Sequence, residues 1–481
     1  MATRTFDAVV IGAGPGGYVA AIRLAQLGKR VALVERESLG GVCLNWGCIP
    51  SKALIAAASL VDEIREAAGR GILVEAPRID LARLREFKSA VVRKLVGGVG
   101  QLEKGNGVEV IAGTARFTSA TGIEVAGGAE PLRLEAPAFI LATGARSIEI
   151  PGFAFGGGAV WSAREAVDLP SLPGRLLVVG GGVIGVELGT VYAKLGAAVT
   201  IVEALPGILA GVDPEAVRLV QRGLRQRGAT IHAGARALGF ERRGEALAVR
   251  IEVGGVAQEI EVDQILVAVG MRPSTEGLGL EAAGVRVGPR GFVEVDGQGR
   301  TSAPSIFAIG DVAGPPLLAH KASKEGEIAA EAIAGRRSTR DWAAIPAAIF
   351  SDPEVASVGL GEEEARREGR QPLVGKFSFG ALGRAIAMDR AEGFVKVIGD
   401  RETGRLLGAT FCGPEASDLV AEATLALEMG ATLEDVALTV HAHPTLPEAF
   451  MEACKAALGE AIHAINRPAR PPAGGRTDRP A

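Results

Sequence analysis

Two cysteines near the N-terminus, Cys43 and Cys48, are the residues whose spacing most directly suggests chemistry. They lie in the segment GGVCLNWGCIPSK, residues 40–52, where one loop or turn could bring them together. Whether their geometry allows a bridge is a structural question. A helix start marked by Pro50 would offer free N–H groups that lower the pKa of the Cys48 thiol, and Lys52 adds positive charge one turn on. The segment predicts a cysteine pair that is reduced and reoxidised in use.

Two other interpretations apply to these cysteines: a pair of inert structural thiols, or half of a zinc site. Zinc needs further ligands, and neither Cys412 nor Cys454 has a partner in a paired spacing. Both sit among apolar residues, so we expect them in the core and expect no metal. Four cysteines in 481 residues do not form a disulfide-rich secreted scaffold. We therefore favour a redox pair in a cytoplasmic protein.

A histidine and a carboxylate near the C-terminus, His443 and Glu448, form a second group with catalytic potential. An imidazole oriented by a carboxylate can take a proton from a thiol near neutral pH. Alone, this spacing suits an ordinary surface loop equally well. The surrounding prolines suggest a shaped loop, and a thiol-disulfide enzyme needs a base. His441 competes for this role, but the Pro-containing segment connects His443 to Glu448.

A repeated unit must position the cysteines: an apolar strand, a glycine-rich turn, a helix, and a second strand that ends in an acid. The first copy starts with DAVVIGAGPGG at residues 7–17 and ends at Glu35; the second starts with LLVVGGGVIG at 176–185 and ends at Glu203. The acid lies equally far from the first glycine in both, as in a shared βαβ unit. Two copies in this context predict two dinucleotide sites, although one could be a packing turn without ligand.

Each turn has glycines that would let the backbone approach a pyrophosphate at a helix N-terminus, where free N–H groups and the helix dipole favour negative charge. The terminal acids would accept hydrogen bonds from ribose hydroxyls. Since no Lys or Arg directly follows Glu203, the second site favours NAD over NADP. The glycines are Gly12, Gly14 and Gly17 in the first turn, and Gly180, Gly182 and Gly185 in the second.

The composition fits an α/β protein with several domains. The chain is 48% hydrophobic with a net charge of −4, which offers no basic face for nucleic acid. Apolar runs that could imitate a signal peptide or a membrane span are interrupted by Asp7 and by Glu187, so we expect neither. Further elements are predicted as strand-like segments at 101–137, strands at 139–144, 265–270, 305–311 and 394–398, and a helix at 416–429.

Taken together, these motifs resemble the pyridine nucleotide-disulfide oxidoreductases, class I, and within them the enzymes that oxidise dihydrolipoamide. The resemblance covers nearly the whole chain and rests on the cysteine segment, the ATG at 143, the GD at 310, LLAHKA at 317–322 and HPTLPE at 443–448. It implies FAD in the first dinucleotide site and NAD in the second. It also implies that Cys43 exchanges with substrate, that Cys48 is the thiolate beside the flavin, and that the His443–Glu448 base comes from the partner subunit of a homodimer.

The same resemblance implies further cofactor contacts and partners. The partners are lipoyl domains on the acyltransferase core of a 2-oxo acid dehydrogenase complex, or the glycine cleavage system. The implied FAD contacts are Lys52, Ala115, Thr143, Gly144, Ala145, Gly310, Asp311, Leu317, Leu318, Ala319 and His320, and the implied NAD contacts are Glu187, Glu203, Ala237 and Gly270.

The implied fold class is two Rossmann-like dinucleotide-binding domains followed by an α+β dimerisation domain. We predict an FAD-binding domain at 1–149 and 275–346, an NAD-binding domain at 150–274, a dimerisation domain at 347–466 and a disordered tail at 467–481. Trp46 departs from the resemblance, since the family commonly has an aliphatic residue there.

Three rival functions are disfavoured. Mercuric reductases end in a vicinal cysteine pair that this tail lacks, and glutathione reduction would call for a basic 2′-phosphate site instead of Glu203. An assembly subunit without catalysis would not need Cys43, Cys48 and His443.

Overall fold

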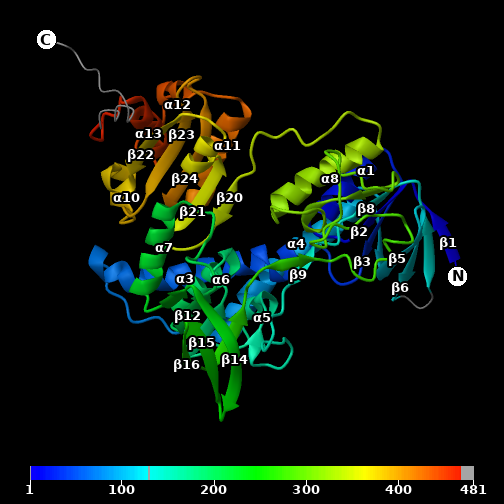
Figure 1. The fold of residues 1–481 in the computed structure, drawn as a ribbon, viewed down its shortest axis with the longest axis horizontal. Helices are drawn as coiled ribbons and strands as arrows, with labels where there is room; N and C mark the ends of the chain where they lie inside the picture. Colours follow the sequence, from blue (N-terminus) through cyan, green and yellow to red (C-terminus); the bar gives the residue numbers. More distant parts are fainter. Residues whose placement is uncertain (1, 128–130, 467–481) are drawn as a thin grey trace. The chain divides into compact units, whose positions relative to one another are not determined.

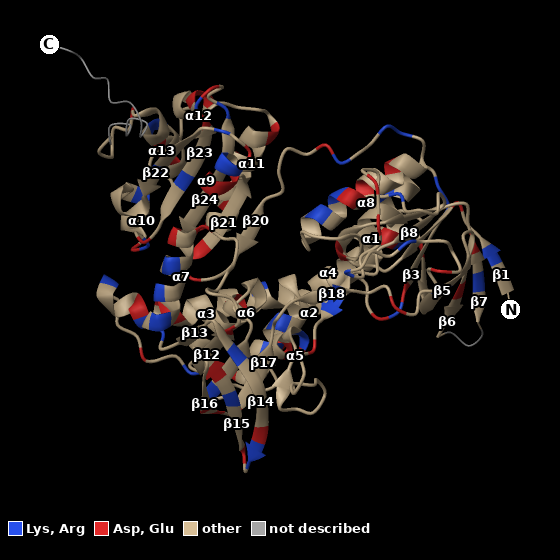
Figure 2. Cartoon of the chain, in the orientation of Figure 1, with Lys and Arg blue, Asp and Glu red and all other residues tan. Residues whose placement is uncertain are grey.

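The computed structural model describes residues 2–127 and 131–466, so the predicted tail at 467–481 lies outside the described residues. The chain divides into two compact units, Met1–Ala210 with Leu224–Asp341, and Gly211–Gly223 with the segment from Trp342 onwards. Figure 1 shows the elements of each unit. Basic and acidic residues are interspersed along individual elements, as on α8 (Ala319–Ile333) (Figure 2).

The first unit contains a five-stranded parallel sheet in the order β19-β8-β2-β3-β4. Apolar side chains cover both faces, as parallel strands require. The carboxyl ends of its strands meet at one edge, where the first glycine turn and Glu35 lie. The strands are β2 (Ala8–Ile11), β3 (Val31–Glu35), β4 (Glu109–Ala112), β8 (Phe139–Leu141) and β19 (Ile306–Ala308).

A second five-stranded parallel sheet in the same unit has the order β10-β17-β11-β12-β13. Its helix α6 (Val183–Lys194) crosses from β11 to β12 just as α1 (Pro15–Gln26) crosses from β2 to β3. The strands are β10 (Val160–Trp161), β11 (Arg175–Val179), β12 (Ala198–Glu203), β13 (Thr230–Ala233) and β17 (Gln264–Val267). Both predicted βαβ units are therefore present, and the predicted α/β fold class is confirmed.

Smaller sheets and further helices complete this unit. The sheets are β1-β7-β6-β5, β14-β15-β16 and the pair β18-β9. Their strands are β1 (Ala2–Thr5), β5 (Thr114–Ser119), β6 (Gly122–Ala126), β7 (Leu132–Glu135), β9 (Ala145–Ser147), β14 (Ala235–Arg243), β15 (Ala246–Val253), β16 (Val256–Val262) and β18 (Met271–Pro273). The helices are α2 (Gly41–Trp46), α3 (Cys48–Glu66), η1 (Ala67–Arg70), α4 (Leu81–Gly105), α5 (Ala163–Asp168) and η2 (Gly310–Ala313).

The helical segment Gly41–Arg70 is long and apolar enough to cross a membrane by length and composition alone. A single such segment is weak support for a span, because core helices of soluble proteins pass the same test. Here α3 buries Leu54, Ala58 and Val61 against the rest of the unit.

The second unit contains a five-stranded antiparallel sheet in the order β20-β21-β24-β23-β22. Phe377, Phe411 and Phe450 are buried in its core, and Cys412 and Cys454 are fully buried, as predicted. The strands are β20 (Ala347–Ile349), β21 (Glu354–Gly359), β22 (Pro372–Ser378), β23 (Phe394–Asp400) and β24 (Leu406–Gly413). The helices are the part of α7 (Pro214–Gln226) up to Gly223, α9 (Glu362–Arg367), η3 (Phe379–Ala381), α10 (Gly383–Ala387), α11 (Ala416–Glu428), α12 (Leu433–Leu438) and α13 (Glu448–Leu458).

The main difference from the sequence-based expectation is α4, a helix of 25 residues that ends at Gly105. The prediction of strand-like structure from residue 101 was wrong over its first five residues. Apolar residues recur along α4 at helical spacing, although Phe87, Leu95 and Leu102 are exposed on it. Within the segment 101–137, strand structure begins only at β4 (Glu109–Ala112).

Candidate active site

The first glycine turn needs each of its three glycines for a different reason. Gly12 has φ +98°, and a Cβ there would lie 2.4 Å from the carbonyl oxygen of Ala142. A Cβ on Gly17 would lie 1.8 Å from the carbonyl oxygen of Gly12. Gly14 differs, since a Cβ there would meet nothing within 4 Å. Two glycines thus pack the turn against its sheet, and the middle one faces open space.

The second turn repeats this pattern. Gly180 has φ +107° and its Cβ would lie 2.5 Å from the carbonyl oxygen of Ala268, while a Cβ on Gly185 would lie 2.0 Å from the oxygen of Gly180. Gly182 again faces open space. Gly14 and Gly182 are the N-caps of α1 and α6 and supply no side-chain cap. Each turn therefore presents backbone N–H groups to a region that a pyrophosphate fits.

The acids that close the two units, Glu35 and Glu203, also share one geometry. Glu35 accepts hydrogen bonds from the backbone N–H of Ala13 and of Glu37, both at 2.7 Å. Glu203 accepts from Gly181 at 2.6 Å and Leu205 at 2.7 Å. Each carboxylate thus holds its own glycine turn while lying at the strand end where a ribose is expected.

Several predicted FAD contacts converge on the same sheet edge. Thr143 follows β8 and donates its hydroxyl to the carbonyl of Ser274 at 2.8 Å, and Gly144 accepts from the Ser274 N–H at 2.9 Å. Ala145 begins β9, which pairs with β18. Ala115 lies on β5, just after Gly113, which donates to the Glu35 carbonyl at 2.8 Å.

Asp311 lies in η2, directly after β19. Burial raises the pKa of its carboxyl, against the influence of Lys321. The predicted contacts Leu317 and Leu318 precede α8, which begins with Ala319 and His320. These residues therefore follow Asp311 within one loop and helix start.

A buried charge cluster that the sequence did not reveal supports the Asp311 loop. Lys321 donates to the Gly314 carbonyl at 2.6 Å, and Glu325 accepts from the Gly310 N–H at 2.7 Å. Glu325 also pairs with Arg340 at 2.8 Å. The only sequence signal was the Lys–Glu pair one helical turn apart, which is common on exposed helices.

The two cysteines lie on two helices and not in one loop, because the chain breaks at Gly47 between α2 and α3. Cys48 begins α3 and is exposed, whereas Cys43 is half-buried, and both are free thiols. A hydrogen bond from Cys43 is the main cause that lowers the pKa of Cys48, and Lys52 lowers it further against burial. The same contact and burial raise the pKa of Cys43. Cys48 is therefore the thiolate of the reduced pair.

Lys52 and Glu187 connect the cysteine helix to the second dinucleotide unit. The Lys52 ammonium lies 2.9 Å from a carboxylate oxygen of Glu187, which is on α6 and buried. The two residues had been predicted as contacts of different cofactors, and the structure brings them together. Of the other predicted NAD contacts, Gly270 has φ +126° and accepts from the Ile148 N–H at 3.1 Å, and Ala237 lies on β14 beside a register shift.

Trp46, the departure in the cysteine segment, packs against a cation. The guanidinium of Arg164 lies 4.0 Å from the centre of its ring and pairs with Glu37 at 2.7 Å. The aromatic residue therefore has a partner of its own beside the cysteines.

In the second unit, the structure distinguishes the two candidate histidines. His443 Nδ1 lies 2.9 Å from Glu448 Oε1, and 77% of the His443 side chain is exposed. His441 is only 6% exposed, and its two ring nitrogens contact Glu422 at 2.8 Å and the Thr439 carbonyl at 2.9 Å. His443 is therefore the better candidate for a base that meets a substrate.

The chain matches the sequence models of two related protein families. Residues 6–326 match the model of the pyridine nucleotide-disulphide oxidoreductases, and residues 345–454 match the dimerisation domain of the same enzymes. The chain belongs to this family.

Individual relatives agree over nearly the full length. The chain is 50% identical to dihydrolipoyl dehydrogenase of Thermus scotoductus over 96% of this chain and 100% of the relative. It is 49% identical to dihydrolipoyl dehydrogenase of Haloferax volcanii over 97% and 99%. Among solved structures, LpdA of Mycobacterium tuberculosis is 28% identical with a TM-score of 0.87, covering 95% and 99%. The HOCl-induced flavoprotein disulfide reductase RclA of Escherichia coli is 28% identical with a TM-score of 0.84, covering 93% and 99%.

Proposed function

We propose that this protein is a dihydrolipoyl dehydrogenase, which oxidises dihydrolipoamide to lipoamide with reduction of NAD⁺ to NADH. The observation that carries the proposal is the placement of Cys48 at the start of α3, with its pKa lowered by Cys43 and Lys52. An acidic thiol is a good leaving group in thiol-disulfide exchange. The full-length similarity to dihydrolipoyl dehydrogenases supports the choice of substrate.

The glycine turns fit the two cofactors, FAD in the first site and NAD in the second. When bound, FAD supplies two-electron transfer between the cysteine pair and NAD⁺. The residues that would hold the pyrophosphates are the turn glycines, with Glu35 and Glu203 at the riboses. Asp311 and Thr143, which follow the strands β19 and β8, would make further FAD contacts.

The exchange step is balanced within the cysteine pair. His443 takes the proton of one substrate thiol, and the thiolate attacks the Cys43 sulfur of the oxidised pair, so that the Cys43–Cys48 bond breaks and Cys48 leaves as thiolate. The second substrate thiol then attacks the substrate sulfur bound to Cys43, so that the disulfide of lipoamide forms, the Cys43–substrate bond breaks, and the proton of that thiol passes to Cys43. The products are lipoamide and the reduced pair, which now holds the two electrons.

The chain is homodimeric, as its match to the dimerisation domain of the family indicates. We propose that His443 of one copy serves the cysteine pair of the other. We further propose lipoyl domains on an acyltransferase core as the physiological substrate and the cytoplasm as the location. Co-purification with a lipoyl-bearing acyltransferase would support this assignment, and its failure with all such proteins of the source cell would contradict it.

Anaerobic titration with dihydrolipoamide tests the reaction itself. We expect the flavin spectrum of the holoenzyme to change in proportion to the added dithiol, and NAD⁺ to reverse the change. A Cys48→Ser variant should bind FAD but lose lipoamide turnover. An unchanged wild-type spectrum would refute the proposal, and faster turnover with NADPH and oxidised glutathione would favour a different disulfide reductase.

A further inference from the structure

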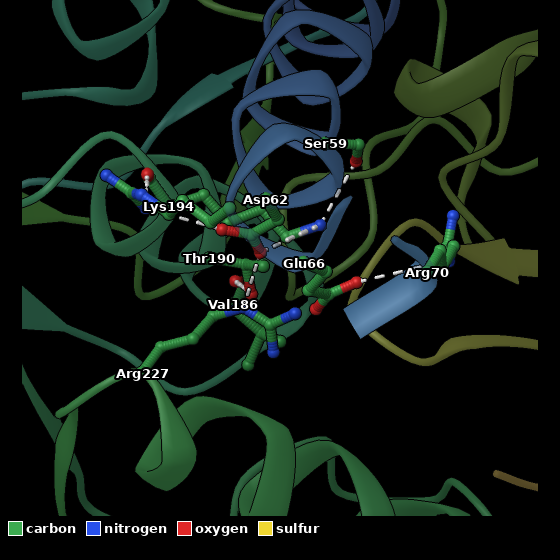
Figure 3. A network of polar contacts seen from close by, with 9 residues as sticks. Ser59, Asp62, Glu66, Arg70, Val186, Thr190, Lys194 and Arg227 are labelled. Carbon is green, nitrogen blue, oxygen red and sulfur yellow. Dashed lines mark hydrogen bonds and ion pairs between the residues drawn. The ribbon is translucent and has the colours of Figure 1, made fainter. Parts of the chain in front are cut away.

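A polar cluster joins α3 to α6 at the end opposite the cysteines. Its centre is Asp62 on α3, which is 8% exposed. One Asp62 carboxylate oxygen lies 2.9 Å from Arg227 Nε and 3.8 Å from Lys194 Nζ (Figure 3). Lys194 is the last residue of α6, is 5% exposed, and donates to the Ser59 hydroxyl at 3.0 Å.

Arg65 adds a backbone contact to this cluster. Its guanidinium donates to the Lys194 carbonyl at 2.8 Å and lies 3.4 Å from Asp62. The last carbonyls of a helix lack partners within the helix, so α3 supplies a donor to the end of α6. Side chains of α3 therefore bind both the ammonium group and the backbone carbonyl of Lys194 at the C-terminal end of α6.

The two helices run side by side in the same direction. Lys52 contacts Glu187 near the N-terminal ends of both helices, and Ser59, further along α3, contacts Lys194 at the C-terminal end of α6; each pair is separated by 135 residues. The order of charge is opposite on the two helices, since α3 has Lys52 before Asp62, and α6 has Glu187 before Lys194. A slip of one turn would break both ion pairs, and buried charges without partners are costly.

We propose that Asp62 is a positioning residue that fixes the axial register of α3 against α6, and with it the place of Cys48 and Lys52 relative to the NAD-site turn. This inference rests on the proposed function. The first residues of α3 carry Cys48 and Lys52, and α6 starts directly after Gly182. Asp62 itself is about four turns away from Cys48 and touches neither cofactor turn.

This role predicts that the two half-reactions respond differently. Exchange between substrate and the cysteine pair depends only on α2 and the start of α3. Electron transfer between the flavin and the nicotinamide depends in addition on α6, so it requires α3 and α6 to keep their relative axial position. Small misplacement of reacting groups has large effects on rate.

The test uses the holoenzyme with Asp62→Asn and, as matched control, Glu66→Gln. Glu66 is one turn further on α3, is exposed, and pairs with Arg70 at 4.0 Å. In stopped-flow experiments we expect Asp62→Asn to slow flavin reduction by NADH about tenfold, and reduction by dihydrolipoamide by less than about twofold. Glu66→Gln should change neither rate.

Two further measurements do not depend on turnover. Hydrogen exchange should become faster in the last turn of α6 in Asp62→Asn but not in Glu66→Gln. The double variant Asp62→Asn with Lys194→Met removes Asp62 and one of its two cations while Arg227 remains, so it should regain part of the lost thermal stability while NADH reduction stays slow. If the double variant regains the NADH rate together with its stability, the cluster is only structural and the proposal fails.

Equal slowing of both half-reactions, or no slowing of either, would also overturn the proposal. The NADH experiment contains no thiol substrate. It therefore tests Asp62 even if dihydrolipoamide does not reduce the wild-type enzyme, an outcome that would refute the proposed function separately.

Discussion

Glu448 holds His443 through one carboxylate oxygen, 2.9 Å from Nδ1, and the Thr445 N–H through the other, at 2.8 Å. Burial alone would raise the pKa of Glu448, but these hydrogen bonds lower it overall. The carboxylate therefore stays ionised and accepts the Nδ1 proton, which directs Nε2 of His443 outward as the base. No contact among the described residues is seen at that atom.

We expect His443→Gln to lower kcat by about 10²- to 10⁴-fold, because a general base is lost. Glu448→Gln should have a smaller effect, since the amide still holds the ring but no longer with a charge. Steady-state kinetics with dihydrolipoamide and NAD⁺ measure both. His441→Gln is the control, because His441 is buried and paired with Glu422. If it lowers kcat as much as His443→Gln, the assignment of the base is wrong.

Removing Cys43 should raise the pKa of Cys48 in the reduced protein. The hydrogen bond from Cys43 is the largest cause of the lowered Cys48 pKa, so Cys43→Ala should shift it upwards, and Lys52→Met should shift it less. The expected result is a smaller thiolate fraction at neutral pH, measured by titration of ultraviolet thiolate absorbance. Cys412→Ala, in the core, serves as control. A Cys48 pKa that is the same in Cys43→Ala and wild type would contradict the geometry.

The glycines of the two turns should separate folding from cofactor binding. Gly17→Ala would place a Cβ 1.8 Å from a carbonyl oxygen, so it should prevent folding of the first unit. Gly14→Ala has space in the protein, so it should fold but retain less FAD, as judged by the absorbance ratio of flavin to protein. In the second turn, Gly182→Ala should leave FAD content unchanged and raise KM for NAD⁺ about tenfold or more. Normal FAD content in Gly14→Ala would refute the proposed approach of the pyrophosphate.

Glu103 on α4 should make stability depend on pH. It is fully buried, neither carboxylate oxygen has a hydrogen-bond partner among the described residues, and burial raises its pKa to about 8. Because the folded pKa exceeds the unfolded one, stability from this group is complete below about pH 4.5 and is lost as pH rises towards 8. Across that window the loss is about 5 kcal/mol at most.

A Glu103→Gln variant removes this titration. We expect the difference in unfolding free energy between Glu103→Gln and wild type to grow in favour of the variant from pH 5 to about 8. Urea unfolding of both proteins at several pH values measures it. Parallel pH profiles would show that Glu103 remains ionised in the folded protein.

The sequence predicts local features of this fold better than contacts between distant segments. Both βαβ units follow from a repeated spacing, because glycine, helix start and acid lie within one short unit. The ion pair of Lys52 with Glu187 joins residues 135 positions apart, so no periodic pattern reveals it. The prediction overlooked α4, although its apolar residues recur at helical spacing from Leu81 to Leu102.

The candidate site shows the same division. Cys43, Cys48, His443 and Glu448 are predicted from residue type and spacing, and the structure adds the direction of each thiol pKa and the greater exposure of His443 than of His441. The buried cluster of Lys321, Glu325 and Arg340 was not predicted, since its members look like ordinary exposed charges until the packing of α8 is known. The domain boundaries and the individual cofactor contacts stay predictions.

The Glu203 carboxylate accepts hydrogen bonds from the N–H groups of Gly181 and Leu205, and these bonds limit how the protein could change its preference from NAD to NADP. A substitution that makes room for a 2′-phosphate would also release two backbone N–H groups at the strand end. The replacement residue would have to satisfy those groups or the turn would lose its shape. Engineering or evolution towards NADPH should therefore require coordinated changes in the whole loop. Glu35 likewise accepts hydrogen bonds from two backbone N–H groups of the first turn, so its replacement would also disturb that turn.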